Sequence, residues 1–260
     1  VCTAALGRSL LITDMMGAQL KGEKDRLTTI IKGGGPAGNI VCTADSRGGV
    51  KGYIENPKLE LPLNHSGKLD VSMAVGWFGE LTVVRDLGLK EPYVGKSNMV
   101  SGEIAEDFAQ YFTASEQQPS MVYLGVRVDP HDGRVRAGGG LIVQPMPFCP
   151  DEVIDKIQDK TPMVKLLAGM LDDGMELEAA LKNIFEGIDV TFTESIETGF
   201  RCDCTRERLE RVLISLGRDE LGDMIEKEHG AELTCHFCNR KYRFSEAELR
   251  GLLAEAGKAQ

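Results

Sequence analysis

Long apolar runs are missing from this chain of 260 residues, and stretches such as Ile142-Val143 or Leu166-Leu167 are far too short to cross a bilayer. No basic and apolar leader opens the sequence, which begins at Val1, so we expect neither secretion nor a membrane span. The phosphate-binding pattern G-x-x-x-x-G-K-[ST], the G-x-S-x-G elbow and the H-E-x-x-H motif are also absent. The sequence therefore predicts no use of ATP and no hydrolytic or transfer chemistry, and we expect a protein that is not an enzyme.

An excess of basic charge is missing as well. The formal net charge is −10, and residues 151–200 carry 4 Lys/Arg against 12 Asp/Glu, so this segment holds nearly all of the excess acid. An acidic chain repels phosphate backbones, and we therefore expect no binding to nucleic acid or to anionic membranes. Mutual repulsion should also make residues 151–200 the least stable part of the molecule.

Residues 1–150 have the pattern of one α+β domain with an antiparallel sheet. A helix is predicted from Thr3 to about Leu20, and another over 102–113. Alternating apolar residues between glycine turns predict strands at 27–31, 40–43, 50–54, 123–128 and 141–144. The pattern G-x-G-x-x-G at 33–38 is followed by another strand rather than by a helix, so it predicts a tight turn and not a dinucleotide site.

The rest of the chain divides after Arg201. Residues 151–201 form an acidic linker in which three short amphipathic helices are predicted around 153–157, 163–171 and 177–185, followed by a strand at 190–193. Residues 202–260 form a small unit of helices and short strands. Its few large apolar side chains make a marginal core, so an added staple is expected.

Cysteine residues are the candidates for this additional cross-link. The seven cysteines are an odd number, which argues against a secreted disulfide framework and for a reducing cytoplasm. Four of them form two pairs, Cys202-Asp203-Cys204 and Cys235-His236-Phe237-Cys238, separated by 30 residues. Zinc prefers four thiolate or imidazole ligands in a tetrahedron, and short Cys turns present two sulfurs to one point. The spacing predicts one zinc ion per chain, with His236 as a less favoured alternative ligand.

The one-residue gap between Cys202 and Cys204 is less common in purely structural zinc sites, and it lets the two sulfurs meet once a metal leaves. Basic residues flank both pairs and favour the reactive thiolate form: Arg201, Arg206, Arg208, Arg240, Lys241 and Arg243. From the spacing alone, a redox switch and an inert structural zinc site remain equal alternatives. Two further alternatives are a zinc ribbon that contacts nucleic acid or ribosomes, and a thiol–disulfide oxidoreductase that uses Cys235 and Cys238.

The residues around these cysteines resemble those of the heat-shock protein 33 family, the redox-regulated holdases of the bacterial cytoplasm. The resemblance rests on Cys202-Asp203-Cys204-Thr205-Arg206-Glu207-Arg208, on Thr234-Cys235-His236-Phe237-Cys238-Asn239, and upstream on Lys32-Gly33-Gly34-Gly35-Pro36 and Ser101-Gly102-Glu103-Ile104-Ala105. It covers nearly the whole chain. The family normally has a few tens of residues before the helix that opens this sequence, so the first strand of the sheet is expected to be missing here.

The resemblance implies a mechanism. In the reduced form Cys202, Cys204, Cys235 and Cys238 hold one zinc ion, and the chaperone is inactive. Oxidation forms the disulfides Cys202–Cys204 and Cys235–Cys238, and zinc leaves. Residues 202–260 and the linker then loosen and expose apolar surface that captures unfolding client proteins during oxidative stress, and the active protein is a homodimer in the cytoplasm.

Overall fold

The computed structural model describes residues 1–256 and divides the chain into two compact units, Val1–Phe200 and the remainder from Arg201 onward. The residues predicted to form the linker, up to Phe200, belong to the first unit. Each unit is described by itself. Among the described residues, no helix combines the length and apolarity that crossing a membrane requires.

The first unit is built on a six-stranded sheet with the strand order β5-β4-β1-β2-β3-β8. Five of its strands are antiparallel neighbours, and the short β8 pairs in parallel with β3 at the edge. The strands are β1 (Arg26–Lys32), β2 (Ile40–Asp45), β3 (Gly49–Ile54), β4 (Glu80–Asp86), β5 (Tyr93–Asn98) and β8 (Gly199–Phe200). The predicted α+β class with an antiparallel sheet is confirmed. Strands β4 and β5 were not predicted, although the alternating burial of β4 is visible in its sequence.

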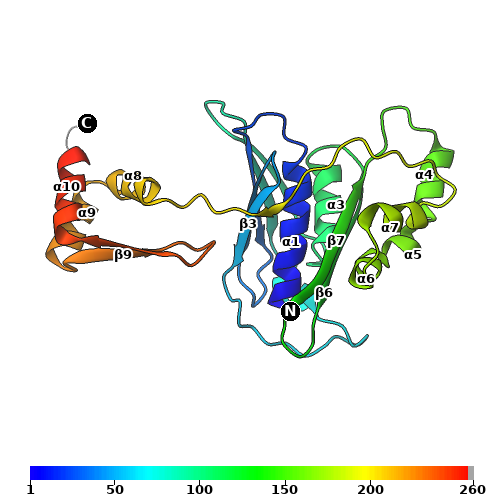
Figure 1. Ribbon diagram of the computed structural model, residues 1–260, viewed down its shortest axis with the longest axis horizontal. Coiled ribbons are helices and arrows are strands. Elements are labelled where there is room, and N and C mark those ends of the chain that lie inside the picture. Colours follow the sequence, from blue (N-terminus) through cyan, green and yellow to red (C-terminus); the bar gives the residue numbers. More distant parts are fainter. Residues whose placement is uncertain (257–260) are drawn as a thin grey trace. The chain divides into compact units, whose positions relative to one another are not determined.

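The long helix α1 (Cys2–Gly17) lies between this sheet and a separate hairpin of β6 (Met121–Val128) and β7 (Val135–Val143) (Figure 1). The helix ends three residues before the predicted Leu20. At its last residue a Cβ on Gly17 would lie 2.6 Å from the Ala44 Cβ, so only glycine allows helix and strand to approach this closely. The glycine turn at 33–38 leads directly into β2, as predicted.

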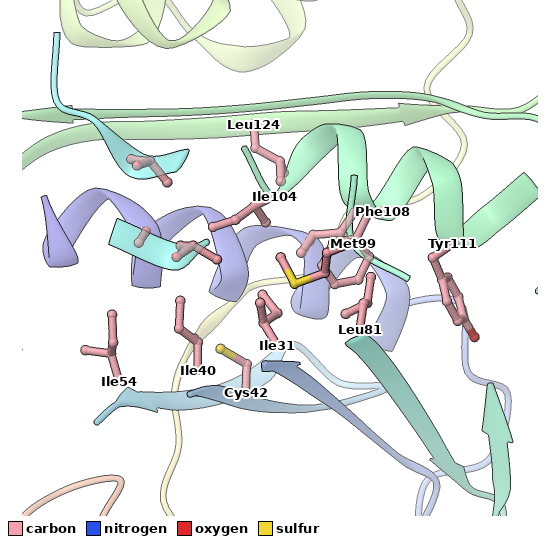
Figure 2. Packing of buried hydrophobic residues seen from close by; sticks show 14 of the residues in the cluster. Ile31, Ile40, Cys42, Ile54, Leu81, Met99, Ile104, Phe108, Tyr111 and Leu124 are labelled. Atoms are coloured by element: carbon pink, nitrogen blue, oxygen red, sulfur yellow. The ribbon is translucent and has the colours of Figure 1, made fainter. Parts of the chain in front are cut away.

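The main core of the first unit lies where the sheet meets the helices. Figure 2 shows Ile31, Ile40 and Leu81 pointing from the strands toward the helices, with Phe108 of α3 (Ala105–Ala114) among them. The short helix α2 (Val71–Val75) contributes a further buried edge. Alternating apolar residues on the strands and apolar residues on the helices bury one common set of side chains.

The linker helices pack on the hairpin at the side away from α1 (Figure 1). Four helices are present, α4 (Asp151–Gln158), α5 (Thr161–Val164), α6 (Leu167–Asp172) and α7 (Leu177–Ile184), because the second predicted helix is divided at Lys165 and Leu166. Leu167 and Ile184 are fully buried against Leu141 in a second core. The prediction of a strand at 190–193 is wrong. Strand propensity alone does not form a strand without a partner to hydrogen-bond to, and the linker pairs with the edge of β3 only at β8.

The second unit holds α8 (Arg206–Leu216), α9 (Arg218–Glu226), the hairpin of β9 (Gly230–Thr234) and β10 (Lys241–Ser245), and α10 (Glu246–Ala256). A capping box begins α10, since the Ser245 N–H donates to Glu248 at 2.8 Å and the Glu248 N–H donates back to the Ser245 hydroxyl at 3.4 Å. The core formed by its described residues is small, with five buried apolar side chains: Leu213, Leu221, Ile225, Phe244 and Leu249. So small a core needs additional stabilisation.

Candidate metal centre

The first cysteine pair lies just before a helix. Cys202 and Cys204 follow β8 and precede α8, whose N-terminal end is capped by the Thr205 hydroxyl accepting the Arg208 N–H at 3.3 Å. Unpaired N–H groups and the helix dipole make such an end favourable for negative charge. A helix N-terminus is one of the settings that stabilise a cysteine thiolate.

The second pair lies in the turn of the β9–β10 hairpin. The Cys235 N–H donates to the Arg240 carbonyl at 3.0 Å, and the Asn239 N–H donates to the Cys235 carbonyl at 2.8 Å. Asn239 has a φ of 58°, a left-handed conformation that asparagine tolerates better than most residues. These bonds close the chain tightly enough for Cys235 and Cys238 to present their sulfurs on the same side.

The turn and the helix end bring all four sulfurs together within 4.8 Å of one another. Cys202 Sγ lies 3.3 Å from Cys204 Sγ and 3.7 Å from Cys235 Sγ, and Cys204 Sγ lies 3.3 Å from Cys238 Sγ. A Zn–S distance of about 2.3 Å in a tetrahedron requires sulfurs about 3.8 Å apart. The donor set and its spacing therefore fit a metal ion such as zinc.

The remaining candidate ligands lie outside this cluster. Within the described residues, the four cysteines form the one group able to hold a metal, and His236 is not a member of it. Cys2 and Cys42 are buried in the first unit, where burial raises the pKa of Cys42 to about 12. Such a thiol stays protonated at neutral pH and is unreactive.

The sulfurs of the cluster differ in pKa. Burial raises the pKa of Cys202 to about 12, and the hydrogen bonds of its own thiol add to this. Burial also raises the pKa of Cys204, but hydrogen bonds from Tyr242 and the neighbouring thiols outweigh it and hold that pKa at about 6. The cluster thus stabilises one thiolate with protons on its neighbours, and a divalent cation can replace those protons.

Tyr242 is a functional residue that the sequence analysis missed. Its hydroxyl donates to the carbonyl of Cys204 and lies 3.4 Å from the Cys204 sulfur, so it both orients the ligand and stabilises its charge. Groups that hold metal ligands in place in this way often matter as much as the ligands. The available signal was an aromatic residue at alternating spacing with Phe244, on the strand that leaves the cysteine turn.

Several flanking basic residues have carboxylate partners. Arg208 pairs with Asp203, while Lys241 and Arg243 both bind Glu232 at 2.7 Å. Arg206 binds Glu248 and lies 4.3 Å from the centre of the Phe244 ring. Tyr242 first, and then the charges of Cys204 and Cys238, raise the pKa of Arg240, so this guanidinium contributes positive charge at the cluster.

Comparison with known proteins places the chain in a family. A family model described as Hsp33 protein matches residues 1–245. The 33 kDa chaperonin of Alkaliphilus metalliredigens is 49% identical over 255 residues, which cover 98% of this chain and 87% of that protein. The 33 kDa chaperonin of Clostridioides difficile is 45% identical over 255 residues, with 98% and 87% covered.

A solved structure agrees with these relatives. The crystal structure of the 33 kDa chaperonin from Thermotoga maritima matches with a TM-score of 0.86 at 41% identity, and the match covers 99% of this chain and 87% of that one. The family match includes all four clustered cysteines and extends from the first unit into the second. This protein, a chaperone rather than an enzyme, belongs to the Hsp33 family of 33 kDa chaperonins.

Proposed function

We propose that the protein is a redox-regulated, ATP-independent holdase that is inactive when its four cysteines hold zinc and active after they are oxidised. The observation that supports this most is the location of the cluster. Its four sulfurs come from two segments of a unit whose described residues form a core of five buried apolar side chains, so the same thiols that react with an oxidant also hold the unit together. Bound zinc supplies a four-ligand cross-link between those segments.

The chemistry uses neighbouring sulfurs. One hydrogen peroxide takes two electrons and two protons from a pair of cysteine thiols, which form one disulfide while the peroxide becomes two water molecules. Two peroxides therefore convert Cys202–Cys204 and Cys235–Cys238 to disulfides and leave no thiolate to hold zinc. When no metal is bound, the lowered pKa of Cys204 makes it the cysteine of the cluster most populated as the reactive thiolate. The one-residue spacing of the first pair favours a strained, readily reduced disulfide, as a reversible switch requires.

Loss of the metal has a large effect on stability. Structural zinc contributes roughly 10–16 kcal/mol of apparent binding free energy in zinc-finger peptides, about as much as the whole stability of a small domain. We expect the unit from Arg201 onward to unfold when it loses zinc. Cys202 lies two residues after the end of β8, so the end of the linker is no longer attached to a folded unit once zinc is lost.

The linker, residues 151–201, then separates from the hairpin that it covers. It is held there by the apolar contacts of α5–α7, by the Tyr123 hydroxyl donating to the Lys165 carbonyl at 2.9 Å, and by an ion pair between Asp172 and Arg136 at 3.0 Å. Repulsion among its own acidic side chains opposes the compact form of the linker. Release uncovers apolar side chains on both partners, a surface suited to the exposed apolar segments of unfolding client proteins.

Contact between the same apolar surfaces of two active chains would favour association of those chains. We propose that the oxidised protein is a homodimer, that it works in the cytoplasm, where thiols remain reduced until an oxidant appears, and that its partners are unfolding proteins rather than nucleic acid.

The experiment is zinc release during peroxide treatment at raised temperature, followed together with light scattering from an aggregating client. Release of one zinc per chain as four thiols disappear, with suppression of aggregation by the oxidised protein alone, supports the proposal. A Cys149→Ser variant is the matched control, because this cysteine lies outside the cluster. If zinc stays bound, or if its loss brings no holdase activity, the site is an inert staple and the proposal is withdrawn.

A further inference from the structure

The end of the linker crosses the edge of the main sheet. Residues 196–200, here called the strap, end in β8, which pairs in parallel with β3 at Gly49 and Val50. The Gly199 N–H donates to the Gly48 carbonyl at 2.9 Å. Gly48 has a φ of +73°, and a Cβ there would lie 2.4 Å from the Glu197 carbonyl, so the strap lies directly on the β2–β3 turn.

Beside the strap is an apolar groove of about 270 Å³ in the first unit. The groove is formed by α1, β3 and the β6–β7 hairpin, and Thr198 of the strap lines it together with Leu11, Val50 and Val135. Asp14 also lines it, and the Oδ1 atom of Asp14 is buried without a hydrogen-bond partner among the described residues. An unpaired buried acceptor beside an apolar groove is costly, and a donor from a ligand relieves that cost.

We propose that this groove and the adjoining edge of β3 bind one extended segment of an unfolded client chain, which takes the place of the strap by parallel strand pairing. The proposal rests on the redox-regulated holdase function, because the strap must leave before a client enters. The strap shows the kind of occupant that fits. Ile196, Thr198 and Phe200 stand at alternate positions in its sequence, and Thr198 lines the groove.

Strand addition explains how one site serves many clients. Backbone N–H and C=O groups on the edge of β3 bind any extended chain, whatever its side chains. The apolar groove then favours segments with β-branched or apolar residues at alternate positions. Such segments are buried in folded proteins and become exposed on unfolding. The site therefore distinguishes unfolded from folded partners without recognising a specific sequence.

The test displaces the strap without touching the zinc cluster. Gly48→Asn keeps a residue that tolerates positive φ but places a Cβ against the Glu197 carbonyl. Gly199→Pro removes the N–H that binds the Gly48 carbonyl. Gly88→Asn is the matched control, since Gly88 has a φ of +70° in another turn and nothing lies within 4 Å of its Cβ position.

The probe is a fluorescein-labelled peptide that copies residues 190–200, and its binding is followed by fluorescence anisotropy on the reduced, zinc-loaded full chain. Displacement raises the fraction of molecules with an open groove, and we expect Gly199→Pro to bind the peptide, which itself retains Gly199, at least about tenfold more tightly than Gly88→Asn. Gly48→Asn should not show this gain, because its Cβ meets the Glu197 carbonyl of the peptide as it meets that of the strap. Adding Gly138→Leu to Gly199→Pro should abolish the gain, because Gly138 lines the groove and a Cβ there makes only ordinary contacts, 3.8 Å from Leu11.

Hydrogen exchange of the Gly199 amide, which donates to the Gly48 carbonyl, reports strap release independently in Gly48→Asn. Unchanged peptide binding by Gly199→Pro overturns the proposal, as does a variant that exchanges straps between two copies and sediments as a dimer while ignoring the peptide. Unchanged Gly199 exchange in Gly48→Asn also overturns it, because the β2–β3 turn then does not hold the strap. The assay needs no oxidant and no zinc loss, so a failure here leaves the peroxide experiment standing, and a failure there leaves this one standing.

Discussion

Asp172 at the end of α6 is the polar contact whose loss tests linker docking most directly. Its side chain is only 7% exposed and accepts two guanidinium partners from the hairpin, Arg136 at 3.0 Å and Arg127 at 3.5 Å. The side chains of both arginines are more than half exposed, so solvent keeps them hydrated when the carboxylate is removed. We expect Asp172→Asn to weaken docking of the linker while leaving both the fold of the hairpin and the zinc cluster intact.

The magnitude follows from the contacts. The asparagine retains one acceptor oxygen of similar size, so the change removes charge rather than packing. Charge-assisted hydrogen bonds contribute roughly 1.5–3 kcal/mol each, while exposed pairs contribute about 1 kcal/mol or less. With exposed arginines and a buried carboxylate, we expect a loss of about 1–2 kcal/mol of docking free energy. That is an increase of about 5- to 30-fold in the population of undocked linker.

Native-state hydrogen exchange of the α6 amides measures this population in the reduced, zinc-loaded protein. The Met170 N–H, which donates to the Leu166 carbonyl at 2.9 Å, is a suitable reporter. Asp173→Asn is the control: it removes the same charge from the next residue, which is exposed. Equal protection in the two variants would refute the argument, because the acidity of the linker, and not the Asp172 ion pairs, would then govern docking.

Four further predictions concern the cluster and the linker core. Tyr242→Phe removes the hydrogen bond to Cys204, and we expect zinc affinity, measured by competition with a chromophoric chelator, to fall about 10- to 100-fold; an unchanged affinity would show that the hydroxyl plays no part. Zinc affinity should fall as the pH decreases, most steeply below about pH 6, because protonation of Cys204 then adds to that of the other thiols. The same chelator competition, repeated across this pH range at constant total zinc, measures the change. Cys235→Ser should release zinc and unfold the second unit in circular dichroism, whereas Cys149→Ser should do neither. Leu167→Ala removes a fully buried contact between α6 and β7 and should destabilise linker docking by about 2–5 kcal/mol, seen as faster exchange in α6 with unchanged zinc content.

Prediction succeeded where the chemistry is local. The α+β class followed from alternating strands and one strongly apolar helix, and the capping box at Ser245 was readable from four consecutive residues. The two Cys pairs were recognisable because each is a tight turn that brings two sulfurs together by itself. The strand predicted at 190–193 failed because strand propensity says nothing about whether a neighbouring edge is within reach.

The sequence alone determined the cysteine donor type, the spacing of the two pairs and the acidic charge of the linker, since these depend on composition and on residues only a few positions apart. Only the tertiary structure decided which partners meet across long separations. It placed the Tyr242 hydroxyl on Cys204, gave Asp172 two arginines from the hairpin, and laid the strap on the edge of β3 beside an apolar groove. Such contacts depend on how packed cores orient distant segments, and no local pattern in the chain encodes that orientation.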